Sequence, residues 1–237
     1  MTRIKTAMVL AAGIGSRMRP LTNDRPKALV EVGGKALIDH VLDRLADAGI
    51  ETAIVNVHHF ADMMEAHLAK RTTAPRIIIS DERPALLDSG GGIKAARHLL
   101  GEDPILVANI DSLWVGGETP PLEAMKAAWD PETMDLLVLL VPRERGIGLE
   151  GPRGFRMDEA GRITHMADDA NPAPLANIGF QIMKPQLLDD QPDGAFSILP
   201  LWWRLQDEGR IFGVIMDAFW LHVGDPAARE AAEAYLQ

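Results

Sequence analysis

The chain has 237 residues, 47% of them hydrophobic, so it can bury a substantial core, most simply as a single domain spanning residues 1–237. Its formal net charge of −10 argues against a general nucleic-acid-binding protein, because such proteins present a broad basic face. The absence of Cys excludes disulfides, thiolate ligands and a thiol nucleophile. With no signal-peptide pattern and no apolar run of membrane-spanning length, we expect a soluble cytoplasmic protein without nucleic-acid or membrane partners.

Positive charge is concentrated near the N-terminus. Residues 1–27 hold six Lys or Arg and one acid, Asp24, so this segment carries +5 while the remaining chain carries −15. A charge run is usually a solvated surface, but here Pro20 and Pro26 fix the course of the chain. We therefore expect this segment to hold a small anionic ligand in one pocket.

Strand-like and helix-like segments alternate over the first 140 residues, which predicts a parallel sheet flanked by helices. The expected elements, in chain order, are a strand at 4–10, a helix at 35–48 ended by Gly49, a strand at 52–57, a helix at 60–70, a strand at 76–80, a helix at 93–100, a strand at 105–109, a weaker helix at 119–130 and a strand at 135–141.

Beyond residue 141 the pattern changes, because Gly, Pro and charged residues fill 142–174. Strand-like pieces at 155–157, 162–166 and 173–183 indicate a small antiparallel insertion over the end of the sheet, where ligands bind in such folds. The chain then returns to a helix at 198–207, a strand at 211–216 and a last helix at 226–236. The predicted fold class is α/β, with one domain and a mainly parallel central sheet.

The first strand leads into a Gly-rich and then cationic stretch, Leu10-Ala-Ala-Gly-Ile-Gly-Ser-Arg-Met-Arg-Pro-Leu-Thr-Asn-Asp-Arg-Pro-Lys27. A strand followed by glycines and cations suits phosphate, since main-chain N–H groups supply donors and the cations supply charge. A dinucleotide-binding fingerprint requires a third glycine where this chain has Met18, and the Gly-Lys-Ser/Thr of a P-loop is absent.

Residues 10–29 instead resemble the signature of the sugar-1-phosphate nucleotidyltransferases, Leu-x-Ala-Ala-Gly-x-Gly-Ser/Thr-Arg-Met/Leu-x-Pro-Leu-Thr-x-x-x-Pro-Lys-x-Leu, except that Leu10 directly precedes the two alanines. The resemblance implies a glycosyltransferase-A-like, Rossmann-like fold. It implies a catalytic group of Arg17 on the β- and γ-phosphates, Lys27 on the α-phosphate and the sugar phosphate, and Asp111 on a metal. The nucleotide contacts that we expect are Leu10, Ala11, Ala12, Gly13, Gly15, Ser16, Arg17, Lys27, Glu82, Gly90, Gly91 and Asn109.

The resemblance also implies Mg2+ as cofactor. Residues 105–111 form a hydrophobic strand that ends in Asp111, at the ligand-binding edge of a parallel sheet. Mg2+ prefers oxygen ligands, often one or two carboxylates together with phosphates, and the family's equivalent Asp binds the metal. The alternative role for Asp111 is a helix N-cap.

The second metal ligand is where this chain departs from the family. The family typically reads Trp-x-Asp-x-Gly-Thr near the C-terminus, whereas this chain reads Trp220-Leu-His222-Val-Gly-Asp225-Pro. Either His222 is a ligand, or Asp225 substitutes for it, or Asp111 works with water and phosphate alone. We favour His222 near the metal, because Asp225 suits the N-cap of the last helix equally well.

Base recognition is expected at residues 81–92, where three consecutive glycines precede the predicted helix at 93–100. Such glycines let the main chain approach a flat base, and the alternative is a flexible turn. The run at 88–93 resembles the N-acetylmuramate 1-phosphate uridylyltransferases of peptidoglycan recycling. Guanylyltransferases that act on mannose 1-phosphate more often carry Gly-Thr-Ala-Gly there.

Sugar contacts are expected from the strand that follows the insertion. Asn177-Ile-Gly179 resembles the family segment under the sugar ring, where Gly179 would let the hexose lie close and Asn177 would bond its hydroxyls. The stretch 196–203 is expected to close the pocket, with Trp202 and Trp203 in the core or at the rim rather than stacked on the ligand.

The resemblance extends over nearly the whole chain and implies transfer from UTP to N-acetylmuramate 1-phosphate, giving UDP-N-acetylmuramate and pyrophosphate. The runner-up is GTP with mannose 1-phosphate, which uses the same catalytic parts. A non-catalytic nucleotide-sugar sensor is the rival from another class, kept open by His222. An NAD-binding domain is disfavoured by Met18, and the sequence specifies no oligomeric state.

Overall fold

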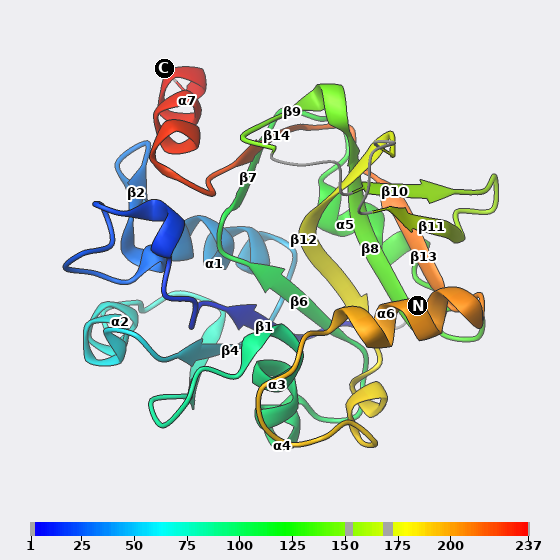
Figure 1. Ribbon diagram of the computed structural model, residues 1–237, viewed down its shortest axis with the longest axis horizontal. Helices are drawn as coiled ribbons and strands as arrows, with labels where there is room; N and C mark the ends of the chain where they lie inside the picture. The colour runs from blue at the N-terminus through cyan, green and yellow to red at the C-terminus, as the bar shows by residue number, and fades with distance from the viewer. Residues whose placement is uncertain (1–2, 150–153, 168–172, 237) are drawn as a thin grey trace.

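The structure, a computed structural model, describes residues 3–149, 154–167 and 173–236 (Figure 1). Among these residues, nine strands form one central sheet, which confirms the predicted α/β fold. Its four N-terminal strands are parallel, in the spatial order β5-β4-β1-β6. Their bounds are Thr6–Leu10 for β1, Thr52–Val57 for β4, Arg76–Asp81 for β5 and Ile105–Asn109 for β6.

The other half of the central sheet is mostly antiparallel. Strand β12 pairs antiparallel with β8 along one side and, along the other side, with β6 at its C-terminal end and with β10 at its N-terminal end; β13 runs parallel to β8. The strands of this half are β8 (Leu136–Pro142), β10 (Gly154–Met157), β11 (Ile163–Ala167), β12 (Leu175–Met183) and β13 (Ile211–Ile215). The predicted antiparallel pieces of the insertion are β10 and β11, which extend this sheet; the rest of the 142–174 insertion lies partly outside the described residues.

Two smaller sheets complete the strands of the described chain. One has the order β7-β14-β9 and the other joins β2 to β3. Their bounds are Ser112–Val115 for β7, Phe219–His222 for β14, Gly146–Ile147 for β9, Glu31–Val32 for β2 and Lys35–Ala36 for β3. Strand β7 follows β6 directly and pairs with β14, so the end of β6 is brought beside the C-terminal Trp220–His222 segment.

The sheet separates two apolar cores, because alternate residues of each strand point to opposite faces. Ala7 and Val9 of β1 pack into the first core and Met8 into the second. The first core is covered by α1 (Leu37–Asp47), α2 (Ala61–Leu68), α5 (Pro121–Ala128) and α7 (Pro226–Leu236). The second is covered by α3 (Asp88–Ala95), α4 (Arg97–Leu100), α6 (Leu199–Asp207) and the short 3-10 helix η4 (Pro185–Leu188).

Helix α1 illustrates how closely the apolar spacing specifies a helix. All five of its large apolar residues, Leu37, Ile38, Val41, Leu42 and Leu45, are buried. Gly49 then adopts a left-handed conformation, with φ 73°, and the N–H of Ile50 donates to the carbonyl of Leu45. This is a standard glycine-terminated helix end, and it confirms the predicted stop at Gly49.

The predicted start of the helix at 93–100 is wrong. Helix α3 begins at Asp88 rather than residue 93, so the three glycines lie inside it. A Cβ on Gly90 would lie 2.4 Å from the Phe196 ring, and one on Gly91 would lie 2.2 Å from the carbonyl oxygen of Gly194. The glycines are therefore required for close packing of α3 against residues 194–196. Because glycine is a poor helix former, the sequence pattern does not predict the first turns of α3.

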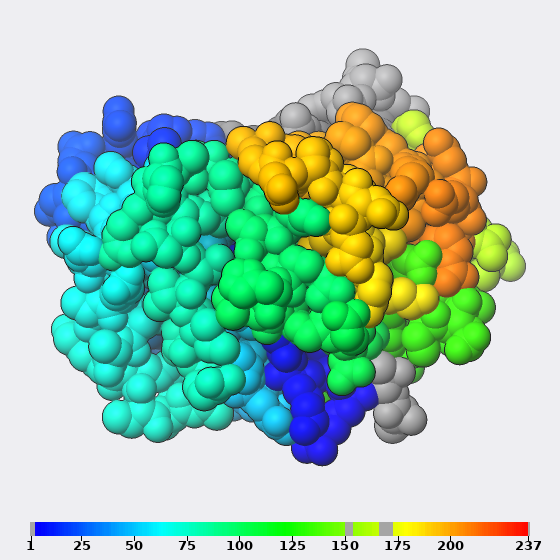
Figure 2. Space-filling view, turned by 90° about the horizontal axis from the view of Figure 1, so that it is seen from below, coloured from blue at the N-terminus to red at the C-terminus, as the bar shows by residue number. Residues whose placement is uncertain are grey.

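Figure 2 shows the face on which α3 and α4 lie beside the later segment that contains η4 and α6. Arg97 pairs with Asp189 at 2.7 Å, and Lys94 donates to the carbonyl of Leu188 at 2.9 Å. These contacts fix residues 185–207 against the N-terminal half of the sheet. Within the described ranges, none of the helices has the length and apolar character needed to span a bilayer.

Candidate active site

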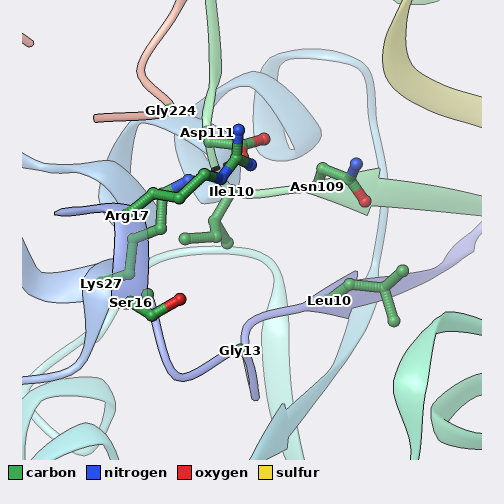
Figure 3. A pocket seen from close by; sticks show the side chains of 10 residues that line it. Leu10, Gly13, Ser16, Arg17, Lys27, Asn109, Ile110, Asp111 and Gly224 are labelled. Atoms are coloured by element: carbon green, nitrogen blue, oxygen red, sulfur yellow. Dashed lines mark hydrogen bonds and ion pairs between the residues drawn. The ribbon is translucent and has the colours of Figure 1, made fainter. Parts of the chain in front are cut away.

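A cavity of about 290 Å³ lies where β1 and β6 end, the edge at which parallel α/β sheets bind ligands (Figure 3). Eight of its ten lining residues are among those that the sequence predicts. They are Leu10, Gly13, Gly15, Ser16, Arg17, Lys27, Asn109 and Asp111, and the other two are Ile110 and Gly224.

The turn that follows β1 places the first of these groups. Gly15 adopts φ 68°, and a Cβ there would lie 2.9 Å from Cβ of Lys27, so only glycine fits comfortably. Its carbonyl oxygen accepts from Thr22 Oγ1 at 2.8 Å and from the Met18 N–H at 2.9 Å. The short 3-10 helix η1 (Ser16–Met18) then directs Arg17 over the cavity toward Asp111 (Figure 3).

Lys27 and Asp111 form an ion pair at the base of the cavity. Lys27 begins the 3-10 helix η2 (Lys27–Leu29), and its Nζ lies 2.7 Å from Oδ2 of Asp111, which follows β6. Their side chains are only 12% and 19% exposed. Opposite charges held this far from bulk water interact more strongly than a surface pair. Asp111 does not cap a helix, because β7 follows it at once.

His222 lies on the other side of Asp111, at the end of β14. Its Nε2 lies 3.6 Å from Oδ2 of Asp111, and its Nδ1 lies 2.8 Å from the carbonyl oxygen of Gly148. Because a carbonyl only accepts, Nδ1 carries a hydrogen; Nε2 carries a second one in the charged ring, which donates toward Asp111, and a lone pair in the neutral ring. A side chain on Gly148 would lie 2.1 Å from the carbonyl oxygen of His222, so glycine is required for this approach.

The charges of this cluster shift the pKa values of its members. Burial alone would raise the pKa of Asp111, but the hydrogen bond to His222 and the charges of Lys27 and His222 hold that pKa well below its ordinary range. Burial alone would lower the pKa of His222, but the hydrogen bond and charge of Asp111 outweigh it and raise that pKa. The aspartate is therefore ionised at neutral pH.

A second cavity, of about 500 Å³, adjoins the first and shares Arg17, Asn109 and Asp111 with it. Asn177 and Gly179, for which the sequence predicts sugar contacts, line it together with His222, the predicted metal ligand. The rest of its wall is largely apolar, from Leu149, Phe155, Ala176, Ile178, Leu199, Trp202, Trp203 and Trp220.

The Asn177–Gly179 segment has a structural role that the sequence did not reveal. Gly179 adopts φ 82°, and a Cβ there would lie 2.5 Å from Nδ2 of Asn109. Asn177 Oδ1 accepts the Gly179 N–H at 2.8 Å and stabilises this turn. Gly179 thus makes room for the side chain of Asn109, which lines both cavities. Contact of Asn177 and Gly179 with a sugar stays a prediction.

The two tryptophans lie as predicted, one in the core and one at the rim. Trp202 is buried in the second core, whereas Trp203 is 49% exposed, and both line the second cavity. The Trp202 ring lies 6.2 Å from that of Phe155, in a tilted arrangement. These aromatic rings offer flat apolar surface to whatever occupies the cavity.

Five predicted nucleotide contacts do not line the first cavity. They are Ala11, Ala12, Glu82, Gly90 and Gly91, all of them buried. The N–H groups of Gly90 and Gly91 both donate to the carbonyl of Phe196, at 2.9 and 3.0 Å. Direct contact of these five residues with a nucleotide stays a prediction.

Asp225 acts as an N-cap in this structure. Its Oδ1 accepts the Ala228 N–H at 2.9 Å at the start of α7. It lines neither cavity, whereas His222 lines the second. The geometry therefore favours His222 over Asp225 beside Asp111. Within the described residues, no group of three or more His, Asp or Glu side chains is placed to hold a metal ion.

The sequence reasoning missed several residues that organise the site. Asn56 accepts from the Gly-rich loop, Gly148 positions His222, and Ser112 Oγ accepts from Trp220 Nε1 at 3.1 Å while donating to the carbonyl of Ile178. The polar Asn56 inside the apolar strand 52–57 was a usable signal, since buried polar groups require partners. Gly148 and Ser112 gave no comparable signal.

The chain is similar to several known proteins. Residues 7–187 match the family model described as the MobA-like NTP transferase domain. An N-acetylmuramate alpha-1-phosphate uridylyltransferase of Caulobacter vibrioides is 54% identical over 98% of this chain and 97% of its own length. One of Neisseria meningitidis is 30% identical over 96% of each chain. A mannose-1-phosphate guanyltransferase of Neurospora crassa is 29% identical, over 93% of this chain but 61% of its own length.

Solved structures share the fold. A UDP-glucose pyrophosphorylase complexed with UDP-glucose superposes with a TM-score of 0.80, at 20% identity and over 99% of both chains. An inositol-1-phosphate CTP transferase from T. maritima gives a TM-score of 0.78 at 19% identity, over 98% of this chain and 96% of its own.

Proposed function

The chain belongs to the MobA-like NTP transferase family, and from this premise we propose that it joins UTP to N-acetylmuramate 1-phosphate, giving UDP-N-acetylmuramate and pyrophosphate. We treat residues 1–237 as one nucleotidyltransferase domain. The predicted resemblance to sugar-1-phosphate nucleotidyltransferases is confirmed, and the 54% identity to the Caulobacter enzyme supports the choice of UTP and of this sugar. Such a product serves peptidoglycan recycling, in the cytoplasm where nucleoside triphosphates are available.

The observation that carries the proposal is the Lys27–Asp111 pair at the base of a cavity that also receives Arg17 and the Gly-rich turn. Two substrates that are both polyanions require fixed cations and main-chain donors at their meeting point. A carboxylate beside these cations would repel phosphate unless it serves another group, which fits a metal-binding role for Asp111.

The reaction forms one bond and breaks one. A phosphate oxygen of the sugar 1-phosphate attacks the α-phosphorus, and the bond to the bridging oxygen of the β-phosphate breaks, leaving its electron pair on pyrophosphate. Because the second pKa of a phosphate monoester is about 6, the attacking oxygen is already ionised near neutral pH and needs no protein base. Arg17 would bind the β- and γ-phosphates and Lys27 the α-phosphate and the incoming phosphate, so that both reacting groups are held in line.

The residues present fit a divalent cation. Asp111 supplies an ionised carboxylate, and the hydrogen bond from Nδ1 of His222 to Gly148 leaves Nε2 directed toward it. Asp111 and His222 would hold the cation, for which Mg2+ is our choice, with phosphate oxygens and water as further ligands. When bound, it would neutralise charge on the triphosphate and the leaving pyrophosphate.

Two other functions are weighed against this one. Transfer of a guanylyl group to mannose 1-phosphate requires only different base and sugar contacts, but two relatives with such a name, from Neurospora crassa and Xenopus tropicalis, are 29% and 27% identical, and the alignment covers 61% of each. A non-catalytic nucleotide-sugar sensor would keep the fold and bind without turnover. The Asp111 and His222 pair argues for turnover, because a damaged metal site would have no reason to keep both groups oriented.

A matrix of four nucleoside triphosphates against N-acetylmuramate, N-acetylglucosamine, glucose and mannose 1-phosphates, read by pyrophosphate release with Mg2+, tests the proposal. We expect the highest kcat/KM for UTP with N-acetylmuramate 1-phosphate. Preference for GTP with mannose 1-phosphate would establish the runner-up instead. Binding without turnover in every combination would establish the sensor.

A further inference from the structure

Two buried polar side chains, Asn56 and Glu82, adjoin the Gly-rich turn of the first cavity and take no part in the mechanism above. Asn56, on β4, is 3% exposed, and Glu82, just after β5, is 2% exposed. Nδ2 of Asn56 donates to Oε1 of Glu82 at 2.7 Å. Neither residue lines either cavity of the site. Burying an amide and a carboxyl group is unfavourable unless both are hydrogen-bonded, so the pair requires a reason.

The reason lies at the other end of the Asn56 amide. Its Oδ1 accepts the N–H of Ala11 at 2.6 Å and the N–H of Ala12 at 3.2 Å. These are the first two residues after β1, where the Gly-rich turn begins. One side chain therefore fixes the point from which Gly13 to Arg17 enter the cavity. Because these two N–H groups donate to Oδ1 of Asn56, they position the turn instead of binding a ligand.

Glu82 sets the orientation of that amide. An ionised carboxylate only accepts hydrogen bonds, so the Nδ2 donor of Asn56 must face Glu82 and its Oδ1 must face the turn. The amide of a glutamine could donate to Oδ1 instead, reverse Asn56 and present a donor to the donors of Ala11 and Ala12. The weak contact of Oε2 of Glu82 with the Leu87 N–H, at 3.4 Å, leaves Asn56 as its principal partner.

Helix α3 is seated on the same pair. A Cβ on Gly92 would lie 2.7 Å from Oε1 of Glu82 and 2.9 Å from Nδ2 of Asn56. Gly92 thus allows the helix to cover the hydrogen bond and exclude water from it. Excluding water strengthens a satisfied buried polar network.

We infer that Asn56, oriented by Glu82, is a positioning residue that presets the Gly-rich turn for polyphosphate without touching the ligand. The inference rests on the proposed function for the identity of that ligand. It gives Glu82 an indirect role, in contrast to the direct nucleotide contact predicted from the sequence.

Binding of UTP and of inorganic pyrophosphate to the full chain, measured by calorimetry, tests the inference. We expect Asn56→Ala to weaken both probes about tenfold, because loss of a buried hydrogen-bond acceptor typically has an effect of this size. We expect Glu82→Gln to weaken them about threefold. Val57→Ala, next on the same buried strand, is the control: it should lower thermal stability while leaving both affinities unchanged.

A double-mutant cycle separates the indirect role of Glu82 from a direct one. If Glu82 acts only through Asn56, Glu82→Gln causes no further loss of UTP affinity in the Asn56→Ala background. A further loss confined to UTP and absent for pyrophosphate would mean that Glu82 reads the base, and would overturn the inference. Glu82→Gln also serves if Asn56→Ala does not fold, since it leaves no buried charge.

Hydrogen exchange distinguishes failure of the inference from failure of the proposed function. Without ligand, Asn56→Ala should abolish protection of the Ala11 and Ala12 amides while the rest of β1 stays protected as in the Val57→Ala control. Unchanged protection would overturn the inference, whatever the ligand. If the wild-type protein binds neither probe but Asn56→Ala still shows the local loss of protection, the proposed function alone would be overturned.

Discussion

The two cavities that share Asp111 are built from different materials. The first is lined by main chain, two cations and a carboxylate, nearly all from the stretch 10–27 and the end of β6. The second is lined mostly by apolar and aromatic side chains from β10, β12, α6 and β14. On the proposed function, the first cavity would carry out the chemistry, which is common to all such reactions, and the second would select the sugar.

The largest effect on activity should come from the Lys27–Asp111 ion pair, since Asp111 lines both cavities. Lys27→Ala or Asp111→Asn is expected to lower kcat by about a thousandfold or more, because each removes a charge that acts on the reacting groups. Pyrophosphate release at saturating substrate measures this. Circular dichroism and thermal unfolding serve as controls, since the remaining partner is left as a mostly buried, unpaired charge. Near-normal turnover in either variant would remove the distinction between the two cavities.

The next effect sharpens the division of the substrates. Arg17→Ala is expected to raise the KM for the triphosphate by about ten- to a hundredfold, since charge-assisted bonds are each worth about 1.5–3 kcal/mol. The KM for the sugar 1-phosphate should change much less. Initial rates with each substrate varied in turn provide the comparison. Equal rises in both values would contradict the assignment of Arg17 to the triphosphate.

A smaller effect tests the apolar cavity. Trp203→Ala should raise the KM for the sugar 1-phosphate a few-fold, because an exposed aromatic surface contributes about 1 kcal/mol to a contact, and leave the triphosphate KM unchanged. Tyr235→Ala is the matched control: Tyr235 is 47% exposed against 49% for Trp203, yet lies on α7 away from both cavities. If both variants behave alike, the wall of the second cavity has no part in binding the sugar.

The smallest effect concerns stability. Because the folded-state pKa of His222 is raised, its contribution is fully present below pH 6.5 and is lost as pH rises through the folded value. The depressed pKa of Asp111 acts oppositely, since its contribution is lost only as pH falls far below 4. The difference in melting temperature between wild type and His222→Gln should therefore shrink from pH 6 to pH 9. A constant difference would show that the two side chains are not electrostatically linked.

How far the sequence could predict this arrangement follows from the same contrast. The first cavity could be predicted because most of its residues lie in two short stretches of the chain, 10–27 and 109–111. One sharp turn, at Gly15, and one strand end, at Asp111, determine their spacing. The parallel strands and α1 could be predicted because a buried face imposes a periodic pattern of apolar residues on the sequence. The second cavity draws on residues from Leu149 to His222, whose proximity depends on strand pairing that no local pattern encodes.

The glycines show a second reason for failure. The three consecutive glycines predict a main-chain segment that a base can approach. Gly90 to Gly92 instead lie in α3, where the absence of a side chain allows other segments of the protein to pack closely against them. Close approach by a ligand and close approach by another segment place the same demand on a residue, the absence of Cβ. Sequence alone cannot separate them, and neither could it show that Gly179 makes room for Asn109.

The division of the interior into two cores has a practical consequence for redesign. The turn that bears Arg17 is anchored in the first core through Ala11, Met18 and Ala28, whereas Trp202, Leu199 and Phe155 belong to or pack against the second. Libraries that randomise Trp202, Leu199 and Phe155 to admit a new sugar should therefore leave the turn that bears Arg17 undisturbed, whereas Trp220, on the same wall, belongs to the first core. Substitutions in β1 are expected to affect both cores, because adjacent side chains of that strand pack into different cores.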